Sequence, residues 1–149
     1  MLLRRIVLAF CIAAVASCRD VAGPADEVAG LYALQRVNAQ ELPTSISCGG
    51  FTIVAADLAL SAAGQATVTR HLITQSVGAE SVYLVVTGRY RVTDSAVLVE
   101  GDGRWSHTPS TFRAQLRFER VDGTLRSAGD GPACDAPPSV EEYGRVVGL

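Results

Sequence analysis

Hydrophobic and polar residues alternate with a period of two along most of the chain beyond residue 28. In the clearest run, residues 81–92, one face holds apolar or small residues such as Val82 and Leu84, while Arg89 and Arg91 lie on the other. The same alternation recurs over residues 112–120. This period is typical of half-buried antiparallel β-strands, with one face toward a core and one toward solvent.

Weaker runs predict further strands, and turn signals separate them. The runs cover residues 31–37, 51–60 with a break near residue 55 or 56, 66–74, 97–100 and 125–128. The turn signals are residues 63–64, 93–95, 101–103 and the Asp122-Gly123 dipeptide, which is a strong hairpin signal. Short strands joined by turns, without helical crossovers, predict an all-β, antiparallel up-and-down meander closed as a sandwich or barrel.

The C-terminal segment allows two interpretations. Residues 139–142 fit a capping box, which would open a short helix. Residues 142–147 can equally form the closing strand of a barrel. Closure removes exposed strand edges, which favours the strand.

The N-terminus has the pattern of an export signal. Arg4 and Arg5 precede an apolar run over residues 6–16, which ends in Ser17 and Cys18. A basic start, an apolar stretch and small residues are the three parts of a secretory signal peptide. The apolar run is shorter than the roughly 20 residues that a helix needs to cross a bilayer, so we expect cleavage rather than a permanent span.

Val15-Ala16-Ser17-Cys18 resembles the lipobox of bacterial lipoproteins, although an ordinary signal peptide with a chance cysteine is the alternative. The resemblance implies cleavage after Ser17 and acylation of Cys18, with the membrane as partner through the lipid. Arg19 in place of the retention aspartate implies the outer membrane of a Gram-negative envelope. The expected organisation is therefore a signal peptide (1–17), an acylated cysteine and tether (18–27) and one barrel domain (28–149).

The remaining cysteines agree with export. Cys11 lies inside the apolar run and would leave with it, whereas Cys48 and Cys134 stay in the mature domain. An even pair in an oxidising compartment predicts a Cys48–Cys134 disulfide. A metal pair is the alternative, but neither cysteine has a histidine close by in sequence.

Charge and motif content argue against several functions. The net charge is −2, and all 13 positive residues are arginine without forming a basic cluster, so we expect no nucleic-acid partner. The sequence holds no nucleophile elbow, phosphate loop, dinucleotide fingerprint or zinc-ligand spacing, so we expect no enzyme activity, cofactor or metal. His71 is expected to be a partly exposed strand residue, and Glu141 and Glu142 a solvated pair.

Two short stretches carry a family resemblance. Residues 30–34, Gly-Leu-Tyr-Ala-Leu, and 37–43, Val-Asn-Ala-Gln-Glu-Leu-Pro, are similar to the opening of small bacterial lipocalin-like lipoproteins, and residues 87–92 occupy the place of that family's central Gly-x-Tyr strand. Ala39 departs from the family's usual glycine. The resemblance implies a compact up-and-down barrel of about eight strands, the size that holds side chains or one small ligand. It implies no chemistry.

Two functional hypotheses follow for a monomeric, non-enzymatic envelope lipoprotein. In the first, the barrel binds a small apolar ligand, and its wall is formed by Tyr90, Phe112, Leu116 and Phe118. In the second, the protein is an interaction or inhibitor protein that contacts an envelope protein or hydrolase through its loops. The contact residues would then be Trp105 and His107, placed in a loop that holds the chain's one tryptophan.

Overall fold

The fold is taken from a computed structural model, which describes residues 24–46, 50–76, 78–128 and 139–147. These residues form one short helix, α2 (Pro24–Val28), and ten strands. The strands are β1 (Gly30–Val37), β2 (Gln40–Glu41), β3 (Thr44–Ile46), β4 (Phe51–Leu60), β5 (Gln65–Thr74), β6 (Ser81–Val92), β7 (Ala96–Trp105), β8 (Thr111–Val121), β9 (Thr124–Ala128) and β10 (Val140–Arg145). None of the described helices is long and apolar enough to span a bilayer.

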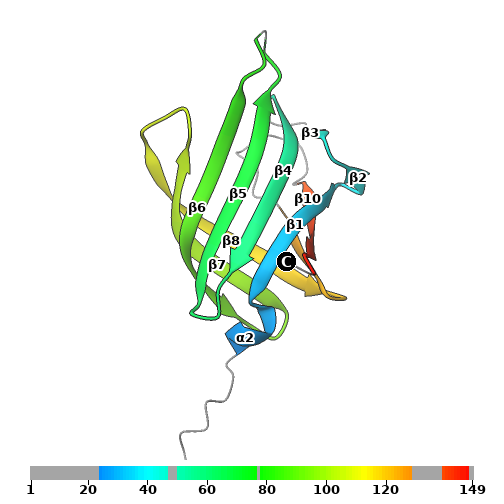
Figure 1. Cartoon of the computed structure of the whole chain (residues 1–149), viewed down its shortest axis with the longest axis vertical. Helices are drawn as coiled ribbons and strands as arrows, with labels where there is room; N and C mark the ends of the chain where they lie inside the picture. The colour runs from blue at the N-terminus through cyan, green and yellow to red at the C-terminus, as the bar shows by residue number, and fades with distance from the viewer. Residues whose placement is uncertain (1–23, 47–49, 77, 129–138, 148–149) are drawn as a thin grey trace, which may run out of the picture.

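Eight of the strands close into a barrel. Strands β4 to β10 follow one another as antiparallel neighbours, β10 pairs with β1, and β1 pairs with β4 to complete the circle (Figure 1). The two short strands β2 and β3 extend the sheet beyond β1 and β4. The predicted all-β, antiparallel up-and-down barrel of eight strands is confirmed.

The C-terminal segment is the closing strand and not a helix. Strand β10 pairs with β1 on one side, with Leu34 opposite Tyr143, and with β9 on the other, with Leu125 opposite Tyr143. A helix here would leave the edges of β1 and β9 unpaired, so closure explains why the strand alternative prevails.

Strand β7 is longer than the sequence indicated. Residues 101–103 were predicted to form a turn, but they lie within β7, with Gly101 directly opposite Gly88 on β6. A Cβ atom at Gly101 would collide with the main-chain oxygen of Thr87, and one at Gly103 would collide with the ring of Phe112. These glycines therefore serve close approaches inside the barrel rather than a reversal of the chain.

The Asp122-Gly123 turn and the break in β4 occur where the sequence predicts them. Asp122 and Gly123 both have positive φ, 47° and 80°, as a two-residue hairpin turn requires. Asn38 and Ala39 also have positive φ, 51° and 64°, so this turn forms despite the alanine. The pairing of β4 with β5 shifts register between Ile53 and Ala55, where the sequence predicted a break.

Helix α2 lies against one end of the barrel (Figure 1). The hydroxyl of Tyr90 donates to the main-chain oxygens of Ala25, at 3.1 Å, and Ser61, at 2.7 Å. The hydroxyl of Tyr32 donates to the main-chain oxygen of Val28 at 2.9 Å. Residues 24–27, at the end of the predicted tether, thus belong to an ordered helix, and we name the end that it covers the closed end.

The predicted acylation site and disulfide fall on other parts of the chain. Cys18, Cys48 and Cys134 all lie outside the described residues. Acylation of Cys18 and the Cys48–Cys134 bond therefore stay predictions.

Candidate functional site

The inward-facing side chains divide the barrel into two halves. Near the closed end and through the middle, Leu58, Phe118 and Tyr143 are fully buried, and the ring of Phe118 meets that of Tyr143 edge-on with centroids 5.6 Å apart. Toward the other end, side chains that also face inward keep exposed surface. These are Phe51, Leu84, Trp105, Phe112 and Leu116, which we call the open half. Ile53, Leu72 and Val82 face inward at the same end and are at most 3% exposed, so this end of the barrel is only partly accessible to solvent.

Aromatic rings gather at the rim of the open half. The ring of Trp105 stacks on that of Phe51 with centroids 6.0 Å apart, and the imidazole of His107 lies 5.8 Å from Trp105. The ring of Phe112 covers Gly103 and is 40% exposed. The sequence placed Trp105 and His107 together in a loop, whereas Trp105 is the last residue of β7 and only His107 lies in the loop that follows.

The four predicted wall residues all face inward, at different depths. Phe112 and Leu116 belong to the open half. Phe118 is fully buried in the packed half, and Tyr90 is 8% exposed beside α2 at the closed end. Phe112, opposite Gly103, lies near the rim where Phe51 and Trp105 stack. Leu116 lies deeper, opposite Val99, which is also the register partner of Tyr90.

A charged cluster crosses the lumen between the two halves. Nη2 of Arg70 on β5 lies 2.7 Å from Oε2 of Glu141 on β10, and the hydroxyl of Tyr143 donates to the same oxygen at 2.8 Å. Strands β4 and β1 stand between β5 and β10 in the wall, so this ion pair spans the interior rather than following the sheet. Ala56, a small residue, lies opposite Arg70 on β4 and leaves room for the long side chain.

Burial governs the electrostatics of this cluster. Burial disfavours the charged form of Arg70, but the charge of Glu141 and the hydrogen-bonding contacts with Tyr143 and Glu141 together outweigh it, so the pKa of the guanidinium is raised from its ordinary value. Burial, followed by the negative charge of Glu141, raises the pKa of the Tyr143 phenol. Arginine stays cationic and Tyr143 stays protonated at neutral pH, so Glu141 is held by one cation and one neutral donor.

Sequence reasoning missed this cluster. Glu141 was expected to be solvated with Glu142, but Glu141 is only 2% exposed. In β10 the side chains alternate, so Glu141 and Tyr143 face the lumen while Glu142 faces outward and pairs with Arg126 at 2.7 Å. Two adjacent acids in a strand necessarily face opposite sides, and that alternation was the available signal.

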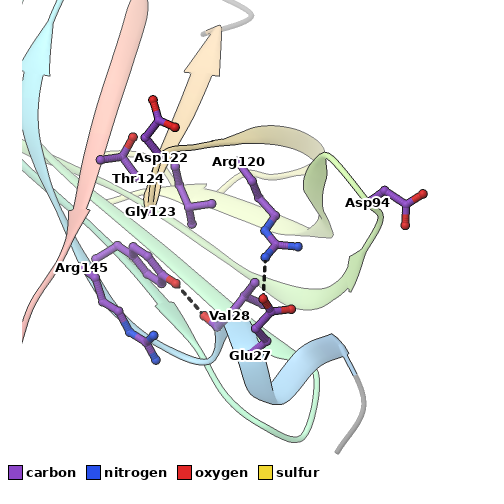
Figure 2. A pocket seen from close by; sticks show the side chains of 10 residues that line it. Glu27, Val28, Asp94, Arg120, Asp122, Gly123, Thr124 and Arg145 are labelled. Carbon is purple, nitrogen blue, oxygen red and sulfur yellow. Dashed lines mark hydrogen bonds and ion pairs between the residues drawn. The ribbon is translucent and has the colours of Figure 1, made fainter.

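A separate pocket of about 540 Å³ lies between α2 and the β8–β9 hairpin (Figure 2). Arg120 enters it and pairs with Glu27 at 3.1 Å, while Nη2 of Arg145 donates to the main-chain oxygen of Ala29. Asp94 and Asp122 also line it. The two arginines thus link strands β8 and β10 to α2 and to the residue that follows it.

His71 lies where the sequence placed it, on the outer face of β5 and partly exposed, with its ring stacked on Tyr83 at 4.6 Å. Among the described residues no cluster of three or more His, Cys, Asp or Glu side chains could hold a metal ion. The described lumen combines apolar side chains near its rim with one charged cluster, Arg70, Glu141 and Tyr143. No family model, curated protein sequence or solved structure matches this chain.

Proposed function

We propose that this protein is a non-enzymatic, lipid-anchored module of the bacterial envelope that binds a small apolar ligand in the open half of its barrel. The observation that carries the proposal is the exposure of inward-facing apolar side chains. A side chain that faces the interior of a barrel is normally covered by its neighbours. When a ligand covers apolar surface that was in contact with water, the free energy falls, which favours binding.

The number of strands favours a small ligand pocket over a channel. An eight-stranded barrel encloses room for side chains or one small molecule. Aromatic rings at the rim give large contact areas, and the packed half, with Phe118 and Tyr143 fully buried, forms a floor. A ligand therefore enters from the end opposite α2.

The test is saturable binding of N-phenyl-1-naphthylamine, an apolar dye that fluoresces when it leaves water. Leu116→Trp places a larger side chain in the lumen, and we expect it to weaken dye binding at least about tenfold. Gln115→Trp is the matched control, because Gln115 is exposed on the outer face of the same strand. No saturable binding, or equal loss in both variants, would refute the proposal.

The envelope location rests on the sequence and has its own test. Acylation of Cys18 predicts that mass spectrometry of the membrane fraction will find an N-terminal peptide that begins at Cys18 and carries acyl chains. A processed N-terminus elsewhere would remove the lipid anchor while leaving the binding proposal intact.

A further inference from the structure

We propose that the pocket between α2 and the β8–β9 hairpin is a second binding site, which takes a singly charged phosphodiester such as the headgroup of a membrane phospholipid. The pocket lies beside α2, at the end of the barrel opposite the open half, so it is separate from the proposed apolar site. Only the lipid source of the phosphodiester rests on the proposed function, because it depends on the anchor at Cys18.

Two arginines line this pocket from the inner side of the barrel wall. Arg120 follows the fully buried Phe118 by two positions on β8, so strand alternation turns it inward. Arg145 follows the fully buried Tyr143 by two positions on β10 and is turned inward in the same way. Figure 2 shows both side chains extending toward α2. The volume of about 540 Å³ is within the usual range of small-molecule sites.

Arg145 is the cation of this pocket that lacks a counter-ion. Its Nη2 donates to the main-chain oxygen of Ala29, which is neutral, and it forms no ion pair with any residue that the structure describes. A Cβ atom at Gly30 would lie 2.9 Å from Nε of Arg145, so the glycine leaves space for the guanidinium. A guanidinium has five N–H groups and Arg145 is exposed, so further donors are available to a ligand.

The other charges in the pocket leave this cation in excess. Arg120 and Glu27 are paired at 3.1 Å and neutralise each other. Asp94 and Asp122 also line the pocket, but Figure 2 shows both carboxylates turned away from the two arginines. A ligand with one negative charge therefore balances Arg145, whereas a second negative charge would be repelled by Glu27 and the two aspartates.

A phosphodiester meets these requirements. It carries one negative charge on two terminal oxygen atoms, which match the paired N–H groups of an arginine. Among monoanions the location favours a lipid headgroup. Cys18 lies six positions before α2, so an acylated Cys18 would hold this end of the barrel within reach of the phosphodiesters of the bilayer.

The experiment uses the full chain in micelles of dodecyl maltoside, an uncharged detergent without phosphate, and measures binding of glycerophosphoglycerol by titration calorimetry. Glu27→Gln removes a carboxylate from the pocket, and its control is Glu119→Gln on the outer face of β8. The two glutamates are 68% and 60% exposed, and each pairs with one arginine of β8. Arg145→Gln removes the excess cation, and its control is Arg91→Gln, an exposed arginine on the outer face of β6.

We expect saturable binding to the original chain. Glu27→Gln should strengthen it at least about threefold, because one negative charge fewer faces the anion. Arg145→Gln should weaken it at least about tenfold, because charge-assisted hydrogen bonds are lost. Both controls should stay within about twofold of the original, because exposed charges on the outer face are screened by salt. Unfolding cannot strengthen binding, so Glu27→Gln keeps the test valid if Arg145→Gln does not fold.

A second measurement identifies the source of the phosphodiester. In vesicles of phosphatidylglycerol, the amides of residues 120–125 should exchange at least about threefold more slowly than in the micelles, because a bound headgroup stabilises the pocket wall. Arg145→Gln should remove this difference and Arg91→Gln should keep it. Slower exchange with glycerophosphoglycerol in micelles, but not in vesicles, would overturn the lipid source and leave a site for a soluble phosphodiester.

The outcomes separate this site from the proposed function. Absence of saturable binding of glycerophosphoglycerol, or an affinity that Glu27→Gln and Arg145→Gln leave unchanged, would overturn the inference while dye binding in the open half stands. Absence of saturable dye binding would refute the apolar site and leave the phosphodiester site standing.

Discussion

Removing the cation of the lumenal ion pair gives the sharpest test of how this barrel is held together. Arg70→Met leaves the Glu141 carboxylate, 2% exposed, with only the Tyr143 hydroxyl as donor. Breaking one side of a buried ion pair costs about 3–5 kcal/mol, because the remaining charge is neither solvated nor paired. The 18% exposure of the Arg70 side chain admits some water, so we expect the lower end, about 3 kcal/mol.

That loss is large beside the roughly 5–15 kcal/mol that holds a domain folded. We expect the melting temperature to fall by about 10 °C, since 1 kcal/mol shifts the midpoint by roughly 4 °C for a domain near this size. Urea denaturation followed by circular dichroism gives the free energy of unfolding directly. The outer pair supplies the control: Arg126 and Glu142 are 42% and 28% exposed, so Arg126→Met should cost no more than about 1 kcal/mol.

A double-mutant cycle isolates the pair itself. In a Glu141→Gln background, Arg70→Met should cost at least about 2 kcal/mol less than in the original chain, because no unpaired carboxylate remains. A cost that is the same in both backgrounds, or a cost below about 1 kcal/mol in the original chain, would show that Arg70 and Glu141 are not coupled in the lumen. The electrostatic reasoning above would then be wrong.

Three further measurements probe other parts of the barrel. Gly101→Ala should destabilise the fold by at least about 2 kcal/mol, because the new Cβ collides with the main chain of Thr87. Gly103→Ala should cost under about 1 kcal/mol, because its nearest neighbour is the ring of Phe112, which can move. Equal costs of the two variants in thermal unfolding would contradict the close contact between Gly101 and strand β6. The pKa of Tyr143 is raised above the ordinary 10.0, so the folded state holds the phenol proton more tightly than the unfolded state does. The contribution of Tyr143 to the free energy of unfolding should therefore be constant below about pH 10 and fall above it. This fall should shrink in Tyr143→Phe, and urea titrations that show the same fall above about pH 10 in both proteins would disprove that Tyr143 causes it. Tyr90→Phe removes hydrogen bonds to two main-chain oxygens and should cost about 1–2 kcal/mol and speed amide exchange in α2, and unchanged exchange there would exclude its role at the closed end.

The fold was predictable because its signals are local. Strand β6 begins and ends where the alternation over residues 81–92 placed it, and the Asp122-Gly123 turn has the backbone that its residues favour. The error in β7 has a physical cause. Gly101 and Gly103 resemble turn residues in sequence, but their purpose is a close contact with another strand, which only the closed barrel reveals.

The candidate site was only partly predictable. Alternation correctly turned Phe112 and Leu116 inward, but it contains no information on how deep each one lies, so Phe118 was grouped with them although it is fully buried. The Arg70–Glu141 pair joins residues 71 positions apart across the lumen. A pairing of that kind depends on which strands close the circle, and no spacing along the chain encodes it.

The placement of α2 has a geometric consequence for the anchored protein. Residue 24 begins a helix at the closed end, and Cys18 precedes it by six positions, which span at most about 20 Å of chain. If Cys18 is acylated, the bilayer surface lies next to α2 and the rim with Trp105 points away from it. The barrel would then stand with its closed end toward the membrane and its opposite end toward the aqueous compartment. The proposed apolar ligand would arrive from that compartment or from a facing membrane rather than from the leaflet that holds the anchor.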